Sequence, residues 1–95
     1  MAGLKYSFDP AAPVDARISE VMVKDGDNWA PIDPAATYGV VTNNYVRTGG
    51  DGYKIFDAEG KKAYDFGPDL ADVTADYLAK LGPYTPVIEG RITKK

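Results

Sequence analysis

Residues 69–81 have the pattern of a helix of several turns, and no other segment of the chain has a convincing helical pattern. Asp69 suits the first turn, and Gly82 with Pro83 ends the helix, glycine as a left-handed cap and proline as a breaker. An apolar stripe at helical spacing marks the face expected to be core: Leu70, Val73, Tyr77 and Leu81. The 95 residues include 10 glycines and 7 prolines. These interrupt the other segments, so only short elements are predicted there.

The first third of the chain has the pattern of strands. Leu4, Tyr6 and Phe8 alternate with polar residues, which is typical of a half-buried strand. A second strand is predicted from Arg17 to Lys24, with a bulge where the alternation slips between Ile18 and Val21. Asp25 to Asn28 is a turn in which Gly26 can take a positive φ, and Trp29 to Ile32 returns to complete a β-hairpin.

Three further short strands are predicted. Tyr38 to Thr42 is apolar on both faces and resembles a central strand, Tyr53 to Phe56 is shorter, and Val87 to Ile92 comes last. Asn43 to Thr48 is predicted as a polar turn or a single helical turn. The predicted fold is α+β: one domain over residues 1–95, with a small mixed or antiparallel sheet, a β-hairpin and one main C-terminal helix at about 69–81.

The composition excludes several kinds of chemistry. The chain contains no histidine and no cysteine, which excludes disulfides, Cys/His zinc sites, iron–sulfur clusters, thiol nucleophiles and histidine-based triads. Its net charge of −3 argues against a nucleic-acid surface. No apolar run is long enough to span a membrane, and the first residues lack the apolar core of a signal peptide. Asp25, Asp27 and Asn28 lack the glutamate that would complete a calcium loop, so a solvated turn is expected.

The glycine-rich segment from Thr42 to Tyr53 is the strongest candidate for a binding loop. Its glycines allow the backbone to approach a ligand closely. The two carboxylate oxygens of Asp51 can accept both hydroxyls of a vicinal diol, and the ring of Tyr45 can stack on a base, which contributes about 1–3 kcal/mol. The alternative is a plain turn in which Asp51 caps its own backbone and Tyr45 and Tyr53 are core. No Lys-Ser/Thr follows the glycines, so this is not a phosphate-binding loop.

Three ordered motifs resemble the C-terminal domain of the 5′-nucleotidases, a family that includes nucleotide-sugar hydrolases. The start, Gly3 to Pro10 with Pro13-Val14 and Arg17-Ile18 after it, is similar to that family's G-L-x-[YF]-x-[FY]-D-P and P-V-x-x-R-I. Tyr38 to Tyr53 is similar to its Y-x-V-x-T-N-x-[FY]-x-x-x-G-G-D-G-[YF]. The ending, Pro86 to Ile92, is similar to its closing V-E-G-R-I. The resemblance therefore covers nearly the whole chain.

The resemblance implies a role in recognising a nucleoside or nucleotide. In this family an N-terminal metallophosphoesterase domain holds two divalent metals, and the C-terminal domain supplies specificity. By this resemblance, Tyr45 takes the position of an aromatic residue, commonly Phe, that stacks on the base. Asp51 takes the position of the residue that binds the ribose, and Asn44 lies beside them. The implied substrate-binding set is Asn44, Tyr45, Gly49, Gly50, Asp51 and Gly52.

The chain also departs from the family pattern. It resembles only the trailing half of the C-terminal domain, without the metal domain or the second stacking aromatic residue, and Asp15 stands where one version of the motif has Gly. We therefore expect no catalytic residue, metal or cofactor in this chain, no activity on its own and no signal peptide, although the parent hydrolase would be periplasmic or extracellular. Its partners would be the nucleotide and the missing domain. The alternative is a non-catalytic structural or protein-interaction module that self-associates through an exposed edge.

Overall fold

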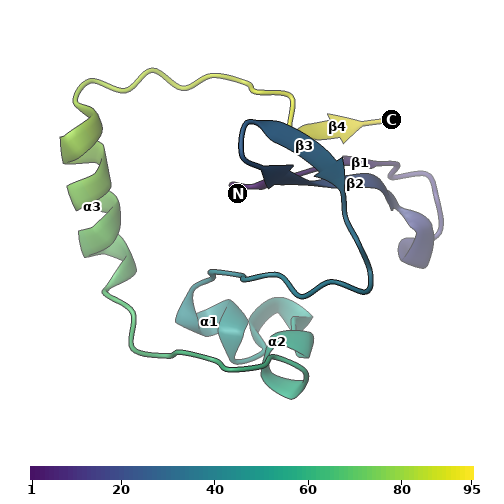
Figure 1. Cartoon of the computed structure of the whole chain (residues 1–95), viewed down its shortest axis with the longest axis horizontal. Helices are drawn as coiled ribbons and strands as arrows, with labels where there is room; N and C mark the ends of the chain where they lie inside the picture. Colours follow the sequence, from purple (N-terminus) through teal and green to yellow (C-terminus); the bar gives the residue numbers. More distant parts are fainter. The chain divides into compact units, whose positions relative to one another are not determined.

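A mixed sheet of four strands is formed by the two ends of the chain (Figure 1). The computed structural model describes residues 1–95. The strands are β1 (Leu4–Phe8), β2 (Ile18–Asp25), β3 (Asn28–Pro31) and β4 (Ile92–Lys94), in the order β3-β2-β1-β4. β1, β2 and β3 are antiparallel neighbours, whereas β4 runs parallel to β1. The sheet, the hairpin and the main helix confirm the predicted α+β class.

The predicted bulge is present in β2. Lys5 pairs with Met22 and Ser7 pairs with Ser19, so three residue steps on β2 oppose two on β1. Glu20 takes up the extra residue with a φ of 53°. The Ser7 hydroxyl donates to the Glu20 carboxylate at 2.5 Å, and Lys95 Nζ lies 3.5 Å from the same oxygen. The Ser7 hydrogen bond and the Lys95 charge hold the pKa of Glu20 below its usual range, so this carboxylate is ionised at neutral pH.

The hairpin between β2 and β3 also forms where the sequence predicts it. Gly26 has a φ of 60°, and the flanking residues Asp25 and Asn28 form the last pair of the ladder. Trp29 is half-buried rather than core, with Lys5 Nζ 5.1 Å from its ring centroid. A short 3-10 turn, η1 (Val14–Ala16), connects β1 to β2.

The last strand differs from the prediction. Val87 to Ile92 was expected to be extended and paired, but β4 begins only at Ile92. The pairing of β4 with β1 includes Tyr6 with Ile92, and the Tyr6 amide donates to the Arg91 carbonyl at 2.9 Å. Because a strand exists only over the residues that find hydrogen-bond partners, an apolar run alone does not define its ends.

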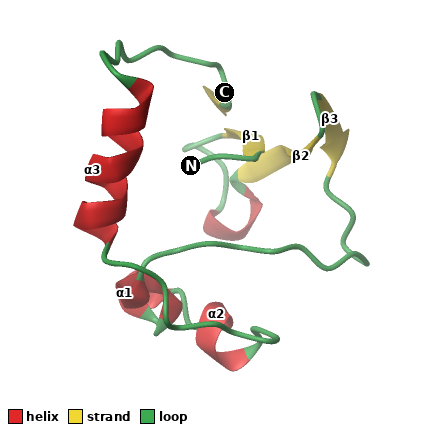
Figure 2. Ribbon diagram, turned by 60° about the vertical axis from the view of Figure 1, so that its left-hand side comes forward, coloured by secondary structure: helices red, strands yellow, loops and turns green.

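Residues 38–85 form a second unit, which is helical. Its elements are α1 (Asn44–Arg47), η2 (Gly50–Gly52), α2 (Ile55–Ala58) and α3 (Leu70–Leu81) (Figure 2). α1 confirms the single helical turn predicted within residues 43–48. The predicted strand at 38–42 is wrong, because this segment pairs with no strand. The predicted strand at 53–56 is also wrong, since Ala58 and Glu59 donate to the carbonyls of Lys54 and Ile55 and close a helical turn.

The main helix has the predicted ends but not the predicted burial. Asp69 caps α3 by accepting from the amides of Ala71 and Asp72 at 2.9 and 3.1 Å, and Gly82 follows its end with a φ of 72°. The apolar stripe that was expected to be core is 42–63% exposed at Leu70, Val73, Tyr77 and Leu81. The chain buries no hydrophobic side chain. A helical period shows which face is apolar, but a second surface has to cover that face before it becomes core. No helix of the chain is both long and apolar enough to cross a membrane.

Candidate functional site

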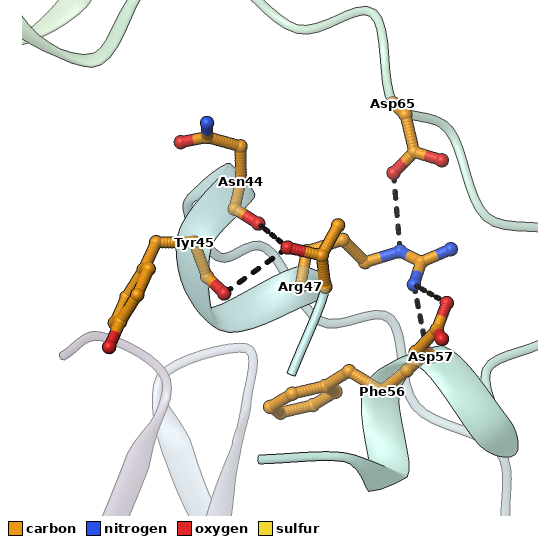
Figure 3. A network of polar contacts seen from close by, with 7 residues as sticks. Asn44, Tyr45, Arg47, Phe56, Asp57 and Asp65 are labelled. Carbon is orange, nitrogen blue, oxygen red and sulfur yellow. Dashed lines mark hydrogen bonds and ion pairs between the residues drawn. The ribbon is translucent and has the colours of Figure 1, made fainter. Parts of the chain in front are cut away.

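The candidate site begins at the capped start of α1. The Asn43 side chain accepts a hydrogen bond from the Val46 amide at 2.9 Å, which satisfies one of the free donors at the helix start. Asn44 and Tyr45 are therefore the first residues of α1. At the other end, the Thr48 hydroxyl donates to the Asn44 carbonyl at 2.9 Å (Figure 3). These bonds hold a short helix of only 4 residues in place without a core beneath it.

The chain after α1 turns through three left-handed residues. Gly49 has a φ of 100°, Asp51 of 53° and Gly52 of 81°. Glycine adopts this conformation without steric cost, and Asp is one of the few other residues that tolerate it. Gly49, Asp51 and Gly52 therefore suit the backbone conformation of this turn. The turn directs the Asp51 side chain back toward α1.

Tyr45 and Asp51 meet across this turn. The Tyr45 hydroxyl donates to Oδ1 of Asp51 at 3.2 Å. A β-carbon on Gly50 would lie only 2.6 Å from Cδ1 and Cε1 of the Tyr45 ring, so the ring lies directly against the glycine. The Tyr45 residue is still 57% exposed. An aromatic face open to solvent and a carboxylate beside it are therefore held together by residues 45–51.

The structure brings most of the predicted binding residues close together. Tyr45, Gly50 and Asp51 are in mutual contact, and Gly49 and Gly52 shape the turn between them. Asn44 is adjacent in sequence, but its amide points away from the Tyr45 ring (Figure 3). The alternative in which Tyr45 and Tyr53 are core is wrong, because these residues are 57% and 52% exposed.

Arg47 supports the site and was not predicted from the sequence. Its guanidinium donates to the Phe56 carbonyl at 3.2 Å and pairs with the carboxylates of Asp57 and Asp65 at 3.4 and 3.2 Å (Figure 3). The side chain is only 23% exposed and leaves α1 on the side away from the Tyr45 ring. It joins α1 to α2 and to the segment after α2. Nothing in the sequence singles out Arg47, because its carboxylate partners lie well beyond the neighbouring residues and Lys54 comes before both of them.

The chain has no group of three or more His, Cys, Asp or Glu residues that could hold a metal ion. Near the site, Asp57 and Asp65 are already paired with Arg47. The acidic residues of the chain therefore assemble no metal centre.

Two hollows of the chain lie in the sheet unit and are not lined by residues of this site. The first, of about 330 Å³, is lined by residues of β1, β2 and the segment around Arg91, including Ser7 and Glu20. Residues 45–51 line neither of these hollows. The site is an open surface whose chemical character comes from one ring face and one carboxylate.

Comparisons with known proteins agree on one family. Residues 1–58 match the family described as 5′-nucleotidase, C-terminal domain. The chain is 34% identical, over 98% of its length, to a 5′-nucleotidase-related protein of Glossina morsitans morsitans. It is 38% identical, over 97% of its length, to a trifunctional nucleotide phosphoesterase protein of Bacillus subtilis (strain 168).

A solved structure agrees with these relatives. The crystal structure of a 5′-nucleotidase precursor from Thermus thermophilus aligns with 98% of this chain, with a TM-score of 0.88 and 37% identity. The chain spans only 17% and 6% of the two relatives and 18% of the crystallised chain. The similarity therefore concerns one part of these proteins.

Proposed function

The chain belongs to the family of 5′-nucleotidase C-terminal domains, and from this membership we propose that it recognises the nucleoside part of a nucleotide without hydrolysing it. One observation carries the proposal: Tyr45 and Asp51, which lie six residues apart in sequence, are joined by a hydrogen bond on one open surface. The binding set is the predicted one, Asn44, Tyr45, Gly49, Gly50, Asp51 and Gly52.

Each group has a chemical role in this proposal. The exposed face of Tyr45 stacks on the planar base, and the Asp51 carboxylate accepts hydrogen bonds from the ribose hydroxyls. Stacking contributes about 1–3 kcal/mol and a hydrogen bond to a charged group about 1.5–3 kcal/mol. Because about 4.1 kcal/mol corresponds to a dissociation constant of 1 mM, a single ring face with a single carboxylate should bind a nucleoside in the millimolar range.

Hydrolysis is assigned to other parts of the larger protein. We propose that residues 1–95 act as one substrate-binding domain, similar to the C-terminal half of the family's C-terminal domain. It would partner an N-terminal metallophosphoesterase domain whose two-metal centre hydrolyses the phosphoester. On this proposal the chain alone is inactive. A periplasmic or extracellular location of the parent enzyme is part of the same proposal and is supported by relatives such as a snake venom 5′-nucleotidase of Macrovipera lebetinus.

Titration with adenosine, followed by amide NMR shifts, tests the proposal. Saturable shifts are expected at Tyr45 and at residues 49–52 with a millimolar dissociation constant. Asp51→Asn should weaken binding about tenfold, because a charge-assisted hydrogen bond is roughly twice as strong as a neutral one. Asn also tolerates the left-handed conformation of residue 51, so the backbone is kept.

Asp15→Asn is the matched control, since it makes the same change in the exposed turn η1 and should not alter binding. If the shifts at residues 45–52 do not saturate, or if Asp51→Asn binds adenosine as well as the unaltered chain does, the nucleoside-recognition proposal is wrong.

A second candidate function is an interaction module that self-associates, and the uncovered α3 face favours it. Sedimentation velocity over a range of concentrations is expected to show a dimer that Tyr77→Lys weakens. Ala75→Lys adds the same charge on the opposite side of the helix and should leave the dimer intact. A strictly monomeric chain at all concentrations would rule out this function without affecting the nucleoside-binding proposal.

A further inference from the structure

We propose that the Tyr45 hydroxyl reduces the selectivity of the site for an intact ribose diol, because it occupies one oxygen of the carboxylate that would bind the diol. The inference rests on the proposed nucleoside-binding function and concerns its specificity. The ring of Tyr45 and its hydroxyl then have separate roles. The ring binds the base, and the hydroxyl limits what Asp51 can accept from the sugar.

The geometry ties the hydroxyl to Asp51. The Tyr45 ring cannot shift toward the turn, because two of its atoms already lie against Gly50. The hydroxyl at the far end of the ring donates to Oδ1 of Asp51 at 3.2 Å. Asp51 itself is held by the left-handed turn, with a φ of 53°. Both ends of the hydrogen bond are therefore positioned by the backbone of residues 45–52.

This hydrogen bond uses part of the capacity of the Asp51 carboxylate to accept hydrogen bonds. An ionised carboxylate is an acceptor with two oxygens, and a vicinal diol uses both of them best. With Oδ1 occupied by the phenol, one sugar hydroxyl can use Oδ2 freely, whereas the second has to share Oδ1 or displace the phenol. Loss of that second sugar hydroxyl should therefore cost little in the unaltered chain. Removing the phenol oxygen frees Oδ1 for the second sugar hydroxyl.

Comparison of adenosine with 2′,3′-dideoxyadenosine tests this inference in the full chain. Both compounds offer the same base to the ring, and only adenosine offers the diol. We expect a ratio of their dissociation constants of about tenfold in the unaltered chain, where the hydrogen bond to Oδ2 is lost. The ratio should be about tenfold larger in Tyr45→Phe, equivalent to one added hydrogen bond of about 1.4 kcal/mol. Any loosening of the ring would change the affinity for both compounds alike, so the ratio isolates the effect of the hydroxyl.

Tyr53→Phe is the matched control. Tyr53 is also an exposed tyrosine of this unit, and its ring lies against Phe56 with centroids 6.1 Å apart. Its substitution should leave the ratio unchanged. A ratio that stays constant or falls in Tyr45→Phe overturns the inference while the nucleoside-binding function stands. If neither compound binds to either protein, the proposed function fails and the inference fails with it.

Discussion

Gly50→Ala is expected to weaken adenosine binding at least tenfold and to destabilise the turn between α1 and η2. A β-carbon on residue 50 would lie 2.5 Å from the Tyr45 carbonyl oxygen and 2.6 Å from two atoms of its ring. Contacts this short do not persist, so the ring or the backbone has to move. Overpacking of this kind costs about 1–3 kcal/mol. A displaced Tyr45 ring loses its hydrogen bond to Asp51 and no longer places its face beside that carboxylate.

Gly39→Ala provides the control for this substitution. A β-carbon on Gly39 meets no atom within 4 Å, and its φ is not in the left-handed region, so the same chemical change should be tolerated there. Adenosine titration and amide hydrogen exchange of residues 45–53 measure both effects. Binding by Gly50→Ala within twofold of that by Gly39→Ala would show that the position of the Tyr45 ring is unimportant for recognition.

Arg47→Met is expected to speed amide hydrogen exchange about 30-fold in α2, which corresponds to about 2 kcal/mol of local stability. The main loss is the charged hydrogen bond to the Phe56 carbonyl, for which about 1.5–3 kcal/mol is typical. The partner carboxylates are largely exposed, with Asp57 at 71% and Asp65 at 57%. Each ion pair should therefore add less than about 1 kcal/mol. Methionine keeps most of the apolar length of the side chain, so the substitution removes chiefly the charge and its hydrogen bonds.

The amides to follow are those of Ala58 and Glu59, which close α2 by bonding to the carbonyls of Lys54 and Ile55 at 3.0 and 2.9 Å. Arg17→Met is the control, since Arg17 also donates to a carbonyl, that of Ala12, but lies in the other unit. Equal exchange of these amides in the two variants would contradict the role assigned to Arg47.

The features that the sequence predicted correctly depend on neighbours a few residues apart. The ends of α3 follow from Asp69 as a cap and from Gly82, which takes a positive φ. The hairpin follows from the positive φ of Gly26 and the bulge from a slip in alternation. The hydrogen bond between Tyr45 and Asp51 was not predicted, but it also depends on nearby residues, because one helical turn and one glycine turn are enough to bring them together.

The features that the sequence did not predict depend on distant partners. Residues 38–42 and 53–56 have the composition of strands, yet neither pairs in a sheet. Arg47 forms its ion pair with Asp65 because the chain reverses direction at α2, which lies between them in sequence. The partner of β4 is β1, at the opposite end of the chain. No short window of sequence contains both members of such pairs.

The sequence by itself determined the capped helix, the hairpin and the glycine-rich turn of residues 49–52, because capping, left-handed glycines and helical period act within a few residues. Only the tertiary structure decided which apolar segments pair as strands, which carboxylates Arg47 engages and whether the α3 stripe is covered. These outcomes depend on hydrogen-bond partners and surfaces that residues far apart in the sequence must supply.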